Sequence, residues 1–190
     1  MNIRGQAYIP NGEYHENVSV QGQGKCPGHL ICSQDVHIAG MFTCEGNLKC
    51  ASLLCAGILR VAGEIEAERI SMSGMLLCEG LLNAEWIDFA LSKSSCSVGS
   101  IGGSEIRVYR EKNIKSARFS FFKKRKARNR GILSVREGIE GDLLDLEGVK
   151  TSKVIGRKVT IGEDCSIDLV QYSETVEIHP DAKVRILEKI

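Results

Sequence analysis

Apolar and polar residues alternate along most of this chain, and glycines interrupt the alternation at a fixed interval. Gly40, Gly57 and Gly74 lie 17 residues apart, and a second set of three glycines, Gly46, Gly63 and Gly80, keeps the same interval. Alternation with a period of two is typical of β-strands, and an internal repeat of this length is typical of a solenoid. The pattern therefore predicts short strands wound into stacked coils of 17 to 18 residues.

The apolar positions fall into columns with the same period as the glycines, and eight columns coincide over the four coils between Val18 and Phe89. Glycines end the alternation at two places in each coil, and polar residues end it at a third. This predicts three strands and three corners per coil, with glycine supplying backbone angles that other residues resist. Equivalent strands of successive coils then pair in parallel, about 4.8 Å apart. The six apolar columns are Val36/Leu53/Ile70/Ile87, Ile38/Cys55/Met72/Phe89, Phe42/Leu59/Leu76, Cys44/Val61/Cys78, Leu48/Ile65/Leu82 and Cys50/Ala67/Ala84.

The repeat extends to the C-terminus, although its spacing varies there. About nine coils are expected, which gives a rod roughly 40 Å long. Residues 18–190 are expected to form one β-helix domain, with residues 1–17 as an N-terminal cap or arm. The expected coil starts are Val18, Val36, Leu53, Ile70, Ile87, Ile106, Leu144, Val159 and Val176.

One segment does not follow the repeat. Residues 107–130 hold eleven Lys or Arg and one acid, Glu111, so the segment carries +10 and the rest of the chain +1 − 10 = −9. We interpret residues 107–131 as a basic loop inserted into one coil. Aromatic residues beside basic ones suit an anionic membrane surface, or less favourably nucleic acid, while a solvated loop is the third interpretation. The candidate contact residues are Phe119, Phe121, Phe122, Lys123, Lys124, Arg125 and Lys126.

The closing coils carry a resemblance to a known family. The stretches 139–142 (Ile-Glu-Gly-Asp), 159–162 (Val-Thr-Ile-Gly) and 165–172, together with the glycine-punctuated period, resemble the bactofilins, which are polymer-forming bacterial cytoskeletal proteins. The resemblance covers about residues 18–184 without the basic segment. It implies a right-handed parallel β-helix and a scaffold that assembles into filaments without nucleotide, often near the membrane.

The chain has eight cysteines but no apolar leader at its N-terminus and no apolar run long enough to span a membrane, so we expect a cytoplasmic protein with reduced thiols. Cys26, Cys44 and Cys78 share one column, and Cys32 and Cys50 share another. A four-thiolate zinc site is the alternative to buried structural cysteines. The same columns hold Val and Ala in the next coil, which favours small core residues, and we expect no metal and no cofactor.

No catalytic constellation is recognisable, and we expect no enzymatic activity. No carboxylate or nucleophile occupies coil positions that match those of the scattered histidines. Left-handed hexapeptide acyltransferases have an aliphatic residue at every sixth position and coils of 18, whereas here the period is 17 with glycines 6 and 11 apart. This disfavours acyl-transfer chemistry.

Two exposed apolar features favour contacts with other molecules. Met41, Ile58 and Met75 form an outward stripe, which is either an interface or covered by the segment 7–9 (Ala-Tyr-Ile). The last coil ends without a covering helix, and a bare terminal coil presents unpaired strand backbone. We therefore expect end-to-end self-assembly through Val176, Ile178, Val184 and Ile186.

The sequence thus favours a non-enzymatic scaffold that forms a homopolymer, with the anionic inner face of the cell membrane and other filament-forming or client proteins as further partners. A module that binds nucleic acid through the basic loop is the first alternative. A hexapeptide-type acyltransferase is the second.

Overall fold

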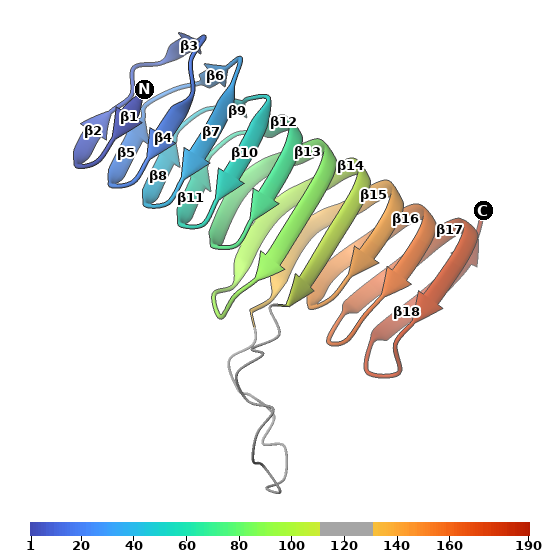
Figure 1. Ribbon diagram of the computed structural model, residues 1–190. Coiled ribbons are helices and arrows are strands. Elements are labelled where there is room, and N and C mark those ends of the chain that lie inside the picture. The colour runs from blue at the N-terminus through green and yellow to red at the C-terminus, as the bar shows by residue number, and fades with distance from the viewer. Residues whose placement is uncertain (111–130) are drawn as a thin grey trace, which may run out of the picture.

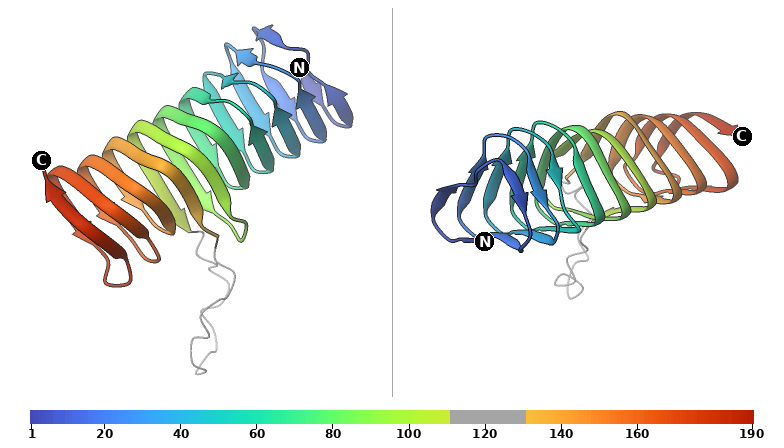
Figure 2. Two further views of the ribbon diagram at one scale, coloured as in Figure 1. Left: turned by 180° about the vertical axis from the view of Figure 1, so that it is seen from behind. Right: turned by 90° about the horizontal axis from the view of Figure 1, so that it is seen from above.

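The computed structural model describes residues 1–110 and 131–190, and every regular element in these ranges is a β-strand. The strands wind into a right-handed parallel β-helix of about ten turns, with the two termini at opposite ends of the rod (Figure 1). Figure 2 shows the coils stacked along a single axis. The fold class predicted from the repeat is confirmed.

The N-terminal half is built from short strands, and the C-terminal half from long strands that continue around two of the three corners. The strands are β1 Asn2–Ile3, β2 Gln6–Tyr8, β3 Gly12–Tyr14, β4 Val18–Val20, β5 Gln23–Cys26, β6 Leu30–Cys32, β7 Asp35–Ile38, β8 Met41–Cys44, β9 Leu48–Lys49, β10 Ser52–Cys55, β11 Ile58–Val61, β12 Ile65–Met72, β13 Met75–Leu91, β14 Cys96–Arg110, β15 Leu133–Leu146, β16 Val149–Ile161, β17 Ser166–Ile178 and β18 Lys183–Lys189.

Three parallel sheets form the walls of the rod. Face 1 contains β4, β7 and β10 and the strand segments in register with them, face 2 contains β5, β8 and β11, and face 3 contains β6, β9 and the start of β12. Between the walls lies one continuous core of buried apolar side chains. The inward residues of each coil therefore stack on those of the coils before and after.

All nine expected coil starts lie in one column of face 1. Direct pairing links Val18 to Val36, and the steps continue through Ile87 to Ile106 and on to Val176. The 19-residue step from Ile87 to Ile106 fits because the chain makes a wider corner between these two strands while the registers on either side are kept.

The N-terminal segment is not an arm outside the helix. β1 pairs with β4, β2 with β5 and β3 with β6, so residues 1–17 form a further coil at the start of the stack. The physical reason is burial: Ile3 and Ile9 are 4% and 0% exposed and continue two core columns. The proposal that residues 7–9 cover the stripe of Met41, Ile58 and Met75 is therefore wrong, because β2 continues the same ladder further along the rod.

The corner glycines are required mainly by close approach and not by unusual backbone angles. Within the described residues, only Gly12 and Gly148 have positive φ among the glycines. At the corner between faces 1 and 2, a Cβ atom on Gly40, Gly57 or Gly74 would overlap the carbonyl oxygen of the glycine one coil earlier. The explanation from backbone angles is therefore wrong for this column, where glycine is needed because each coil lies against the previous one.

A polar ladder joins successive coils at the corner between faces 2 and 3. The His29 N–H donates to Asn11 Oδ1 (2.6 Å), the Asn47 N–H donates to His29 Nδ1 (3.0 Å), and the Glu64 N–H donates to Asn47 Oδ1 (3.1 Å). Each side chain thus satisfies a backbone donor of the following coil at a corner where regular strand pairing is interrupted.

The eight cysteines are buried and unbonded core residues. Cys26 and Cys44 are direct partners in adjacent strands, as the column pattern predicts. Burial raises the pKa of Cys44 to about 11 and that of Cys50 to about 12. Both thiols are therefore neutral at physiological pH.

Candidate functional site

The C-terminal coil leaves part of the core uncovered. Val176, Ile178 and Val184 continue inward columns of the helix, because they pair with Val159, Ile161 and Ile167 of the coil before. Ile178 is 39% exposed, although residues of the same column inside the rod are buried. Within the part of the chain that the structure describes, β18 pairs on one side only, with β17.

Ile186 is placed differently from the other three predicted interface residues. It pairs with Leu169 on the outer side of the rod, whereas its neighbour Leu187 pairs with Val170 and continues an inward column. Leu187 is 46% exposed. The alternation shifts here because the chain passes a corner, so Leu187 is the terminal core residue that the predicted set lacks.

The N-terminal end is better covered. Ile3 and Ile9 are buried although only one coil lies against them, and Met1, Ala7 and Tyr14 pack on the core there. The Tyr14 hydroxyl donates to the Pro10 carbonyl oxygen (2.6 Å) and holds this cover in place. The two ends therefore differ, and the apolar one is C-terminal.

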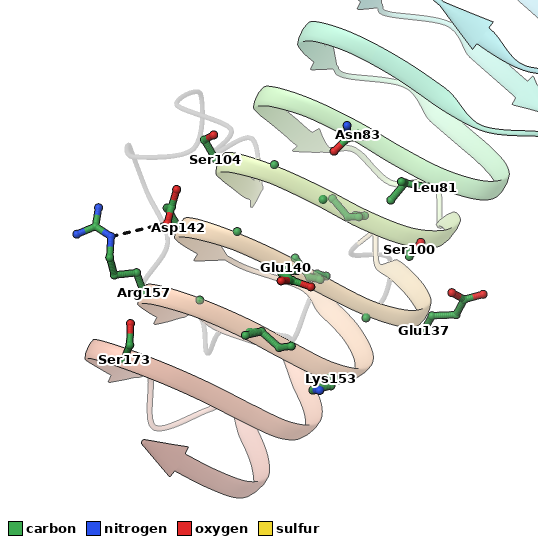
Figure 3. A pocket seen from close by; sticks show the side chains of 18 of the residues that line it. Leu81, Asn83, Ser100, Ser104, Glu137, Glu140, Asp142, Lys153, Arg157 and Ser173 are labelled. Atoms are coloured by element: carbon green, nitrogen blue, oxygen red, sulfur yellow. Dashed lines mark ion pairs between the residues drawn. The ribbon is translucent and has the colours of Figure 1, made fainter. Parts of the chain in front are cut away.

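A polar groove runs along face 3 in the C-terminal half, with a volume of about 830 Å³ (Figure 3). It is hollow because the inward column changes from Ala84 to Gly103, Gly141 and Gly156, which carry no side chains. Asp142 and Arg157 lie at its rim and form an ion pair (3.8 Å), and Arg157 also pairs with Glu174 (2.8 Å). The hydrogen bond from Arg157 lowers the pKa of Glu174, so this rim is a neutralised ladder between coils.

Face 1 carries exposed aromatic and cationic groups. Trp86 is 42% exposed, and the guanidinium of Arg69, one coil earlier, lies 3.9 Å from its ring centroid. Arg107 stacks in the same way on Tyr109, at 4.7 Å. The sequence pattern did not single out these residues, because their column contains no repeated residue type.

The predicted membrane or polyanion contacts, 119 and 121–126, lie outside the described residues. The start of the insertion is corrected: Arg107 to Arg110 belong to β14 and pair with neighbouring strands. The Arg110 guanidinium donates to Asp164 (2.8 Å) and to the Gly131 carbonyl oxygen (3.4 Å). Residues 110 and 131 are therefore neighbours in space, and the β-helix is closed where the insertion begins and ends.

The described residues show no group of three or more side chains placed to ligate a metal. They also include no helix of the length and apolarity needed to cross a membrane.

Comparison with known proteins gives two relatives and no function. The chain is 33% identical over 110 residues to the uncharacterized protein YhbF of Bacillus subtilis, which covers 58% of this chain and 42% of the relative. It is 43% identical over 54 residues to the uncharacterized protein YhbE of the same organism, which covers 28% of this chain and 23% of the relative. The chain thus spans less than half the length of either relative. No family model and no solved structure matches.

Proposed function

We propose that this protein is a non-enzymatic structural scaffold whose rods associate end to end into filaments without nucleotide. The observation that carries the proposal is the C-terminal coil, which leaves Ile178 and Leu187 exposed in columns that are buried elsewhere. Burying one such side chain fully is worth about 1.5–3 kcal/mol. Contact with a second rod at this end would continue the core.

Backbone hydrogen bonding adds to this apolar contribution. The outer edge of β18 presents N–H and C=O groups in strand geometry, and such an edge is a template for a further strand. A second rod stacked on it would satisfy these groups and place its own inward residues over Ile178. The resemblance of the closing coils to bactofilins supports the same function.

We further propose that the filament attaches to the inner face of the cell membrane through the basic segment. The support is compositional: three phenylalanines directly precede four consecutive basic residues, 123–126. Each basic side chain near anionic lipid contributes about 1 kcal/mol. Repetition along a polymer would turn a weak single site into stable attachment.

Electron microscopy and size-exclusion chromatography of the purified protein in nucleotide-free buffer test the assembly. We expect filaments for the wild type, and short oligomers for Ile178→Arg and Val184→Arg, because a charge in the terminal stack must be desolvated. Glu177→Arg is the matched control, since it introduces the same side chain between these positions on the outward, exposed side.

Circular dichroism would verify that all three variants keep their β-structure. Filaments of unchanged length in both inward variants would remove the C-terminal coil from the interface. A wild type that stays monomeric at all concentrations would refute end-to-end assembly itself.

A further inference from the structure

Face 1 displays one outward ladder in unbroken register across seven coils. Its central member is Trp86, the only tryptophan of the chain. Away from the two end coils, the exposed large apolar side chains of the described residues are Ile31, Leu54, Trp86 and Leu143, and the last three lie on this face. The ladder runs Asp35, Ser52, Arg69, Trp86, Glu105, Leu143 and Lys158.

The charges of this ladder change sign about Trp86. One coil before Trp86 stands Arg69, and one coil after it stands Glu105. Three coils before it stands Asp35, and three coils after it stands Lys158. Each charge thus has an opposite charge at the same distance on the other side of Trp86.

Within the described residues, most of these charges form no ion pair, in contrast to charges on the other faces. Elsewhere, ion pairs join neighbouring coils, as in Lys49–Glu66 (2.7 Å) and Arg157–Glu174 (2.8 Å). Of the ladder charges, only Lys158 has such a neighbour in the described ranges, 3.7 Å away at Glu174. Arg69 and Glu105 are two coil steps apart, about 9.6 Å, so they do not pair with each other.

We propose that face 1 binds face 1 of a second copy of this chain, with the two rods antiparallel and related by a twofold axis along the strand that holds Trp86. Such an axis places coil n before Trp86 opposite coil n after it. Trp86 then meets Trp86 of the second copy, Arg69 meets Glu105, and Asp35 meets Lys158. Every charge of the ladder faces its opposite twice, once from each rod.

This contact lies along the rod and is separate from the end-to-end contact proposed above. Six coil steps of about 4.8 Å give the ladder a length of roughly 29 Å. A patch of that length and one strand in width forms a weak pair between single rods. In a filament the same contact would repeat along the polymer, so lateral pairing is stronger between filaments than between free chains.

The neighbouring outward ladder identifies the one unfavourable contact. Asp88 lies in the coil of Trp86, between Ser71 and Arg107 of the adjacent coils. The axis brings Asp88 against Asp88 of the second copy, which is a like-charge contact. Asp88→Asn is therefore expected to tighten the pair, a gain that a merely solvated residue would not give.

The decisive experiment is a mixing test with two charge reversals, Arg69→Glu and Glu105→Arg. Alone, each variant faces itself with like charges at two symmetric places, and we expect its dimer dissociation constant to rise roughly tenfold or more. Mixed one to one, the introduced glutamate of one variant faces the introduced arginine of the other, and pairing should return. No rescue within one chain can mimic this result, because neither variant carries both changes.

Sedimentation velocity over a range of concentrations measures the pairing, in an Ile178→Arg background that blocks the C-terminal end. Lys150→Glu and Glu13→Arg serve as controls, since they make the same kinds of charge change at exposed positions away from face 1. Trp86 fluorescence is an independent reporter, because its emission should shift to the blue as the wild-type dimer forms. Singles that pair like the wild type, or a mixture that does not recover, would overturn the proposal.

The width and length of filaments separate the two assembly contacts. If both exist, wild-type filaments are two rods wide and Arg69→Glu filaments are one rod wide at unchanged length. Loss of length without loss of pairing would count against the end contact alone. Single-width wild-type filaments together with monomeric end-blocked protein would count against lateral pairing alone.

Discussion

The carbonyl oxygen of Gly40 occupies the position that a Cβ atom on Gly57 would take. The same relationship links Gly57 to Gly74 and Gly22 to Gly40. Coils are therefore held closer at this corner than any residue with a side chain permits. The glycine repeat sets the distance at which the three sheets can all pair.

Replacing Gly57 by alanine should consequently destabilise the rod by about 1–3 kcal/mol, since overpacking of a tight contact costs this much. Gly5→Ala is the control. Gly5 stands in the same column, but a Cβ atom there meets nothing within 4 Å. Denaturant unfolding at pH 7 measures both, and equal stability of the two variants would refute the close-approach explanation.

The ladder at the second corner makes a separate prediction. Asn47→Ala removes the acceptor of the Glu64 N–H and should cost about 1 kcal/mol. His29→Asn keeps an acceptor of the kind found at Asn11 and Asn47, so its cost should be smaller. Chemical denaturation of the two variants compares them, and a larger loss for His29→Asn would contradict the ladder.

The cysteines should behave as packing residues. Exchanging Cys44 for Val and Cys50 for Ala, the residues of the same columns one coil later, is expected to change stability by less than about 1.5 kcal/mol. Zinc bound in stoichiometric amount by the purified wild type, and lost in this double variant, would show the packing explanation to be wrong.

The same thiols predict a loss of stability in alkali. Burial raises the pKa of Cys44 from 9.0 to about 11 and that of Cys50 from 9.0 to about 12. Below pH 9 both states hold the proton and nothing is lost. Above pH 9 the unfolded chain ionises first, so stability should fall as pH rises toward the folded values. The double variant should show a shallower fall in denaturant unfolding between pH 8 and 11, and an identical fall would exclude these two thiols as its cause.

Membrane attachment is tested by co-sedimentation with liposomes. The wild type should bind vesicles that contain anionic lipid and not neutral vesicles, because the attraction is electrostatic. A variant with Phe119, Phe121 and Phe122 changed to Ser should bind anionic vesicles more weakly, since each buried aromatic contributes about 1–2 kcal/mol.

Binding of single-stranded nucleic acid by the wild type, with no vesicle binding, would transfer the role of the segment to the first alternative function. Failure of the wild type to sediment with either type of vesicle would reject the membrane anchor.

The period of the sequence was sufficient to predict the core of this fold. Inward columns such as Val36/Leu53/Ile70 recur in kind, because every coil buries the same position against the same neighbours. The first coil was missed because it contributes few apolar residues. Ile3 and Ile9 keep the period, but Arg4, Gln6 and Tyr8 between them break the pattern.

The outer surfaces were less predictable, for a physical reason. Outward residues are selected by what approaches the rod and not by their own stacking, so Arg69, Trp86 and Glu105 share a ladder without sharing a residue type. Their relationship depends on the register across a 19-residue step. At the C-terminal coil, the parity shift that exchanges Ile186 for Leu187 is likewise a matter of where the chain turns.

The open space at Gly5 can serve as a reporter of filament polarity. In the next four coils, the Cβ position of this column points at a carbonyl of the preceding coil. At Gly5 it points out of the N-terminal end, toward whatever rod stacks there. A single methyl group at residue 5 would leave the isolated rod intact, yet it would stop growth if the C-terminal end of one rod continues into the N-terminal end of the next. Filaments that tolerate the methyl group would instead be built without that junction, so one atom distinguishes a directional polymer from one whose two ends are alike.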